Sequence, residues 1–260
     1  MIMIEIIDLH KSFNGKPVLC GVNLTIHKGE SHIIIGRSGC GKSVLLKHII
    51  GLLYPDRGEI VVDGLPVTRL KHKELYRVRK KIGMLFQNSA LFDSMTVEEN
   101  IALGVREHRM FPESEIRSRV ARLLDMVGLP GIQNMYPAEL SGGMKKRVAL
   151  ARALMMEPEY VLYDEPTTGL DPIMAESIND LIIRINDALG VTTVVVTHDM
   201  ASAYKIGDKM SMLEEGKVIF TGTPEEIRKS KNPVIQKFIT GNLLYSSPDQ
   251  HSQLEDKGWS

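Results

Sequence analysis

The sequence has 260 residues, 43% of them hydrophobic and 25% charged, which is ordinary for a globular protein and enough for one large α/β domain. Lysine plus arginine and aspartate plus glutamate each number 32, so the formal net charge is zero, which argues against a dedicated nucleic-acid-binding protein. The two cysteines, Cys20 and Cys40, lie apart in the sequence, so we expect no structural disulfide and a reducing compartment.

The chain opens with an apolar run, MIMIEIIDLH, that contains Glu5 and Asp8. It lacks the positive start and small-residue cleavage site of a signal peptide, so we interpret it as a strand. No apolar run approaches the roughly 20 residues that cross a bilayer. We therefore expect any membrane role to depend on a partner.

Short β-type runs alternate with helical patterns, which predicts an α/β fold. The expected strands are Ile2–Leu9, Val18–Ile26, His32–Ile35, Glu59–Val62, Ile82–Phe86, Tyr160–Tyr163, Thr192–Thr197, Lys209–Leu213 and Lys217–Thr221. The most apolar of them lack alternation, as expected for strands buried on both faces of a mostly parallel sheet. The last two are joined by EEG, a hairpin-type turn.

The β signal fades between Asn88 and Glu157, which indicates a helical insert within the α/β domain. Apolar residues from Ile116 to Val127 mark one amphipathic helix, and Gly128 stops it. A second amphipathic helix is expected over Ala175–Leu189. After Pro224 we expect one or two helices and then a loose polar tail.

The segment GRSGCGKS, which we call the phosphate loop, lies between an apolar run and a helical pattern and matches G-x-x-x-x-G-K-[ST]. Its glycines let the backbone turn tightly and aim N–H groups at phosphates, its lysine adds a positive charge, and its serine hydroxyl is a ligand for Mg²⁺. We predict a nucleotide site formed by Gly36, Arg37, Ser38, Gly39, Cys40, Gly41, Lys42 and Ser43.

Polar residues at the ends of three other apolar runs complement the phosphate loop. Asp164 and Glu165 end one such run, at the sheet edge where α/β proteins bind ligands. Because consecutive strand residues face opposite ways, we expect Asp164 to hold Mg²⁺ through its water shell and Glu165 to polarise the attacking water as general base. His198, after VVVT, is a candidate γ-phosphate sensor, and Gln87, after IGMLF, is placed to reach Mg²⁺ and the attacking water.

The segment LSGGMKKRVALARAL, residues 140–154, offers a second cradle for phosphate. Ser141, Gly142 and Gly143 open what the apolar spacing predicts to be a helix. We call residues 140–143 the signature segment. A helix N-terminus stabilises an anion only within its first turn, so this cradle stays idle until a partner molecule delivers a phosphate.

Together these motifs resemble the ATP-binding cassette (ABC) family of ATPases, in that family's order and approximate spacing, over residues 1 to about 225. The resemblance implies an α/β fold: a P-loop ATPase with a RecA-like, mostly parallel core sheet, an antiparallel β subdomain and a helical subdomain at about residues 88–157. Residues 226–260 are then a C-terminal helical extension and polar tail. The resemblance also implies that Phe13 stacks on adenine and that Asp171 lies in the loop linking two ATP sites.

ABC proteins pair two cassettes head to tail, so the resemblance implies a homodimer. The phosphate loop of one chain and Ser141, Gly142 and Gly143 of the other would enclose one ATP. The cofactors would be ATP and Mg²⁺, the metal being held by Ser43, Gln87 and Asp164, with Glu165, His198 and Gln87 as the catalytic residues. ATP then holds the dimer together, and hydrolysis releases it.

A narrower resemblance is to the ATPases of MCE-associated, Mla-type lipid transporters. Val44, where many ABC proteins have Thr, and Met144, where many have Gln, both agree with that branch. The implied function is ATP hydrolysis that drives lipid transport through a transmembrane permease, with an MCE-type lipid-binding subunit attached through the permease. The implied place is the cytoplasmic face of the inner membrane. The permease would contact residues 87–94 and the segment that includes Tyr136.

Two other functions fit parts of the sequence. A soluble, single-cassette ABC ATPase that acts as an assembly factor would carry the same motifs without a permease. A phosphate-loop kinase or GTPase would share the phosphate loop, but the signature segment and His198 argue against it. No base-reading segment of the N-K-x-D type found in GTPases is present.

Overall fold

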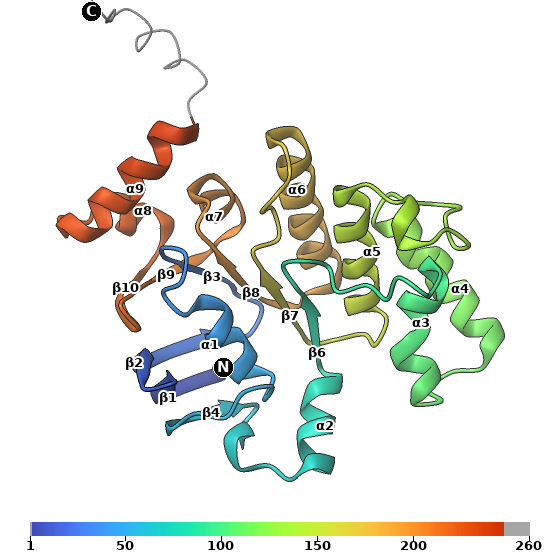
Figure 1. Ribbon diagram of the computed structural model, residues 1–260, viewed down its shortest axis with the longest axis horizontal. Coiled ribbons are helices and arrows are strands. Elements are labelled where there is room, and N and C mark those ends of the chain that lie inside the picture. The colour runs from blue at the N-terminus through green and yellow to red at the C-terminus, as the bar shows by residue number, and fades with distance from the viewer. Residues whose placement is uncertain (1, 247–260) are drawn as a thin grey trace, which may run out of the picture.

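The computed structural model describes residues 2–246 (Figure 1). The strands are β1 (Ile2–Phe13), β2 (Lys16–His27), β3 (Ser31–Ile35), β4 (Arg57–Val62), β5 (Leu65–Pro66), β6 (Ile82–Leu85), β7 (Tyr160–Asp164), β8 (Thr192–Thr197), β9 (Lys209–Glu214) and β10 (Lys217–Gly222). The α-helices are α1 (Lys42–Ile49), α2 (His72–Lys80), α3 (Val97–Glu107), α4 (Glu113–Met126), α5 (Gly142–Leu154), α6 (Pro172–Leu189), α7 (Met200–Ile206), α8 (Pro224–Arg228) and α9 (Pro233–Ser246). Short 3₁₀ turns occupy Val67–Arg69 and Pro137–Glu139.

The core sheet has six strands in the order β10-β9-β3-β8-β7-β6. All neighbouring strands run parallel except the β9–β10 hairpin, which turns through Glu215 and Gly216, both at positive φ. Every residue of β3, β7 and β8 is buried, which explains why their apolar residues are consecutive and do not alternate with exposed polar ones. Because these strands are parallel, their carboxyl ends meet at one edge of the sheet.

A second, antiparallel sheet has the order β2-β1-β4-β5. It packs with α1 and α2 over one face of the core sheet, whereas the longer helices cover the other face. Successive residues of β3 point to opposite faces of the core sheet. Ile34 belongs to the hydrophobic cluster on the side of the antiparallel sheet, and Ile33 and Ile35 belong to the cluster on the side of the longer helices. The core sheet is therefore the middle layer between two hydrophobic clusters.

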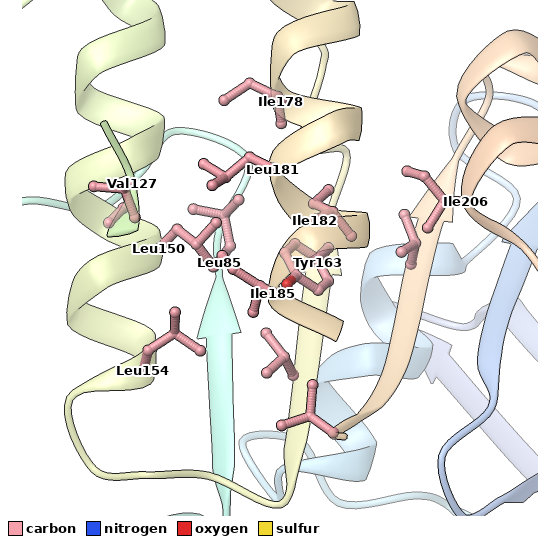
Figure 2. Close-up of a cluster of buried hydrophobic side chains, with 14 of the residues drawn as sticks. Leu85, Val127, Leu150, Leu154, Tyr163, Ile178, Leu181, Ile182, Ile185 and Ile206 are labelled. Carbon is pink, nitrogen blue, oxygen red and sulfur yellow. The ribbon is translucent and has the colours of Figure 1, made fainter. Parts of the chain in front are cut away.

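Helices α3, α4 and α5 lie together at one end of the molecule (Figure 1). The last of them also packs on the core: Leu150 and Leu154 of α5 lie against Leu85 of β6, and α6 stands beside them (Figure 2). We call α5 the signature helix, because it begins within the signature segment. It is thus joined by apolar contact to β6, the strand that leads to Gln87.

The strands expected from the sequence are all present, with ends that differ by a few residues. Helix α6 begins at Pro172 rather than Ala175, because the Asp171 side chain caps it by accepting a hydrogen bond from the Met174 N–H at 2.9 Å. The domain boundary expected after residue 225 falls inside α8, and the buried Ile227 belongs to the same cluster as the core sheet. The tail beyond residue 246 lies outside the described residues.

Candidate functional site

The phosphate loop connects β3 to α1 at the carboxyl edge of the core sheet. Gly36 has no room for a side chain, because a Cβ there would lie 2.3 Å from the Leu213 carbonyl oxygen. Gly41 precedes α1 with φ 108°, a conformation that favours glycine. The loop therefore has the tight, side-chain-free path that brings backbone N–H groups close to a phosphate.

Lys42 lies within the loop's curve and is 4% exposed. Its ammonium donates to the carbonyl oxygens of Gly36 at 2.7 Å and Arg37 at 3.0 Å, and its Nζ lies 3.4 Å from Oε1 of Glu165. A cation held in this way faces the position where a phosphate would enter, and its contact with Glu165 ties the loop to the residue that follows β7.

Asp164, the last residue of β7, accepts a hydrogen bond from the Ser43 hydroxyl at 2.6 Å. Burial raises the pKa of this carboxyl; the Ser43 hydrogen bond opposes that shift, and the neighbouring Glu165 charge adds to it. A serine hydroxyl beside a carboxylate is a pair of hard oxygen ligands, which suits Mg²⁺. The donor set therefore fits a magnesium ion bound together with substrate phosphates.

Glu165 follows β7 in a left-handed conformation, with φ 50°. Its Oε2 lies 2.8 Å from Nδ1 of His198 and accepts a hydrogen bond from the Thr168 hydroxyl at 3.1 Å. The different directions expected for Asp164 and Glu165 do not come from strand alternation, because β7 ends at Asp164. The left-handed backbone turns Glu165 away instead, and such strain in a non-glycine residue is typical of functional sites.

These residues surround a pocket of about 490 Å³. It is lined by Val18, Ser38, Gly39, Gly41, Lys42, Ser43, Val44, Gln87, Glu165, Thr168 and His198. The pocket brings together side chains from the ends of β3, β6, β7 and β8, as parallel strands allow. It combines a phosphate cradle, a carboxylate and an imidazole, the parts required for attack of water on a phosphoanhydride.

The signature segment lies elsewhere. Ser141 caps α5 by accepting a hydrogen bond from the Met144 N–H at 3.3 Å, and among the described residues none from the signature segment lines the pocket. A Cβ on Gly143 would lie 2.2 Å from Cε of Met174, so the first turns of α5 and α6 are in contact. The two segments thus form one surface, on which Ile173 is 82% exposed.

Comparison with known proteins identifies the family. A model described as "ABC transporter" matches residues 19–168, more than half of the chain. This chain belongs to the ABC transporter family. Its fold is accordingly that of an ABC ATPase, as the sequence predicted, and it is an enzyme that binds nucleotide and couples ATP hydrolysis to transport.

Three similar proteins define its place within the family. Mkl of Mycobacterium tuberculosis, described as a probable ribonucleotide transport ATP-binding protein, is 43% identical over 243 residues, or 94% of this chain and 68% of the relative. MlaF of Haemophilus influenzae, an intermembrane phospholipid transport system ATP-binding protein, is 42% identical over 239 residues, or 92% and 90%. A solved dimeric ATP-binding cassette with bound ADP and Pi has a TM-score of 0.79 and 35% identity, covering 85% of this chain and 99% of its own.

Phe13 and the two cysteines of this ABC ATPase are not among the residues that line the pocket. Phe13 is 40% exposed and lies beneath the Lys11 ammonium, 5.5 Å from the ring centroid, so it is a surface ring and not a core residue. Cys40 is a free thiol, and burial raises its pKa. Cys20 is also free, in agreement with the expected absence of a disulfide.

Three residues at or beside the site of this ABC ATPase were not predicted from the sequence. Val18 lines the pocket from β2 and Thr168 supports Glu165 with a hydrogen bond; each lies close to a motif residue, but no role was expected of it. Lys146 of α5 is 5% exposed and donates to the Gln87 carbonyl oxygen at 2.7 Å. Its charge within an otherwise apolar helical face was the available signal.

Proposed function

We propose that this ABC ATPase drives phospholipid transport. The support is its likeness to MlaF, whose length it covers to 90%, against 68% for the mycobacterial relative named for ribonucleotides. Among residues 2–246 no helix is long and apolar enough to cross a bilayer. We place the protein at the cytoplasmic face of the inner membrane, with a transmembrane permease and, through it, an MCE-type lipid-binding subunit.

The geometry at Glu165 carries the chemical part of the proposal. Its carboxylate lies between the Lys42 ammonium, which would move to the phosphates of ATP, and the His198 ring, which would sense the γ-phosphate. When the phosphates draw Lys42 away, Glu165 is free to accept a proton from the attacking water as general base. Mg²⁺, with Ser43, Asp164 and Gln87 as its protein contacts, would neutralise developing phosphate charge.

A second copy of the chain completes each site in this proposal. The signature segment presents the N-terminus of a 13-residue helix outside the pocket, so its N–H groups are available to the ATP of a partner. Asp171 lies on the same surface as the exposed Ile173, at the loop between the two ATP sites. We propose a head-to-tail homodimer in which the segment from about residue 88 to 157 moves as one helical unit.

The permease would dock on exposed aromatic residues of that unit. Phe92 is 50% and Tyr136 46% exposed. Their segments lie close together, because the Val97 N–H donates to the Met135 carbonyl oxygen at 2.8 Å. Asn100 is fully buried and hydrogen-bonds both the N–H and the carbonyl of Phe92, which fixes the loop that would receive a permease helix.

Two substitutions test the shared site. Glu165→Gln should bind ATP and accumulate as a dimer while hydrolysing ATP at a small fraction of the wild-type rate. Ser141→Arg should leave ATP binding by the monomer nearly intact and abolish hydrolysis. Dimer formation is measured by light scattering with Mg-ATP, and turnover by phosphate release. Wild-type turnover in Glu165→Gln would refute the general base, and loss of monomer binding in Ser141→Arg would refute the shared site.

Purification from membranes tests the transport part. We expect a multi-spanning permease to co-purify with the protein, and mass spectrometry of the complex to find phospholipid. A protein recovered without a permease would instead support the soluble assembly factor. A complex that carries another class of molecule would refute the phospholipid proposal while leaving the ATPase site in place.

A further inference from the structure

A buried lysine joins the signature helix to the ATP pocket. Lys146 stands in the second turn of α5 and is 5% exposed. Its ammonium donates to the Gln87 carbonyl oxygen at 2.7 Å and to the Glu165 carbonyl oxygen at 3.2 Å. These acceptors are the backbone groups of the two pocket residues that follow β6 and β7. One side chain therefore holds both strand ends to one helix.

The energetic cost of this arrangement argues for a use. Burial lowers the pKa of Lys146, and the Glu165 and Asp164 charges act in the opposite direction. A buried ammonium is costly unless it is hydrogen-bonded, and hydrogen bonds from a charged donor to carbonyl oxygens are strong and directional. A hydrophobic side chain would pack at the same place without this cost, so packing alone does not explain a lysine.

A second cation on the same helix grips the same loop. Arg152 donates to the carbonyl oxygens of Ser89 at 2.7 Å and Ala90 at 2.6 Å, both of which stand at positive φ. Helix α5 thus holds the backbone that follows β6 with two side chains that stand about one and two-thirds turns apart along the helix. Of these two cations, Lys146 also reaches Glu165, through the carbonyl oxygen of that residue.

We infer that Lys146 is a positioning residue for ATP hydrolysis, which sets the backbone of Glu165 and Gln87 according to the orientation of the signature helix. The inference rests on the proposed roles of Glu165 as general base and of the signature segment as the cradle for the partner's ATP. When the signature segment closes on the partner's ATP, it orients α5. Through its hydrogen bonds, Lys146 then positions Glu165, the general base that acts on the chain's own ATP. Lys146 therefore lies between the two ATP sites of the dimer.

The test begins with Lys146→Met, which keeps the length and apolar stem of the side chain and removes its donors. We expect kcat for ATP hydrolysis to fall about tenfold to a hundredfold, the range expected for loss of charge-assisted hydrogen bonds, while KM for ATP changes less than about twofold. Arg147→Met is the matched control, since Arg147 is next along the helix and donates to the Val127 carbonyl oxygen and the Ser177 hydroxyl, each at 2.7 Å. Its kcat should stay near wild type.

A double-mutant cycle with Glu165→Gln separates positioning from general damage. In single-turnover measurements, Lys146→Met should slow hydrolysis strongly when it is introduced into the wild-type protein. Introduced into Glu165→Gln, it should slow hydrolysis less than about threefold, because the Glu165 carboxylate through which it acts is already absent. Equal slowing in both backgrounds would overturn the inference, as would an unchanged kcat or an equal loss in Arg147→Met. If Lys146→Met does not fold, Lys146→Gln, which keeps an amide donor, enters the same cycle.

The two levels of the proposal fail in different ways. Wild-type turnover by Glu165→Gln refutes the general base, and this inference with it. An inactive Glu165→Gln together with a fully active Lys146→Met refutes the positioning role alone.

Discussion

Replacing Asp164 by asparagine should stabilise the nucleotide-free protein and impair its reaction. Asp164 is 4% exposed, adjoins Glu165 and accepts a hydrogen bond from the Ser43 hydroxyl. An asparagine oxygen can accept the same hydrogen bond without a buried charge. Relief of this kind at a functional site stabilises by about 0.5–2 kcal/mol, which for a chain of this size corresponds to a rise in Tm of about 1–8 °C.

The pH dependence of that gain has a defined sign. Burial raises the pKa of Asp164, so the folded state binds this proton more tightly than the unfolded state. Wild-type stability therefore falls as pH rises above the ordinary aspartate pKa of about 3.9, and the advantage of Asp164→Asn is largest at neutral pH and shrinks as pH falls.

Thermal unfolding at several pH values, first in EDTA without nucleotide and then in Mg-ATP without EDTA, measures these effects. Mg-ATP should raise the Tm of the wild type more than that of Asp164→Asn, because a ligand that binds the folded state more tightly stabilises it more. Asp56→Asn is the contrasting control: hydrogen bonds from Lys11 and the Ser12 N–H lower the pKa of Asp56, so its loss should lower Tm. A nucleotide-free Tm for Asp164→Asn at or below that of the wild type would refute the reasoning.

Three further substitutions probe the pocket. Gly36→Ala should lower both Tm and ATP affinity, measured by unfolding and calorimetry, because its Cβ would meet the Leu213 carbonyl oxygen at 2.3 Å; wild-type affinity would contradict the tight path of the loop. Lys42→Ala should lose ATP affinity, whereas Glu165→Gln should keep it. Titration of each variant with a fluorescent ATP analogue measures the two affinities. Phe13→Ala should weaken ATP binding by about 1–2 kcal/mol, or fivefold to thirtyfold in Kd, if the exposed ring stacks on adenine, whereas an unchanged Kd would remove it from the site.

The sequence was most informative where local patterns dictate structure. The phosphate loop could be predicted because its glycines, lysine and serine act within eight consecutive residues between a buried strand and a helix. The strand ends that carry Asp164 and His198 could be placed at one edge because parallel strands share a direction. Phe13, which sequence alone left between core and surface, is settled as a surface residue by its 40% exposure.

Contacts between distant residues were beyond sequence reasoning. Lys146 reaches a carbonyl oxygen 59 residues away, and no periodicity in α5 indicates which backbone group a buried ammonium would meet. The separation of Asp164 from Glu165 was foreseen for the wrong reason, since a single positive φ, not the pleat, turns the second carboxylate. The residues of the candidate site could therefore be predicted from motifs, but the hydrogen bonds between them depend on tertiary packing.

The burial of β7 from both sides limits how this enzyme can be regulated. Val161 and Tyr163 belong to one hydrophobic cluster, and Tyr160 and Leu162 to the other. Sliding or tilting the strand would disrupt the packing of both clusters at once, so the end of β7 is held in a fixed position. Regulation of the rate, by inhibitors or accessory chains, must therefore change the arrival of ATP or of the partner's signature segment at this strand end. The strand end itself keeps its position.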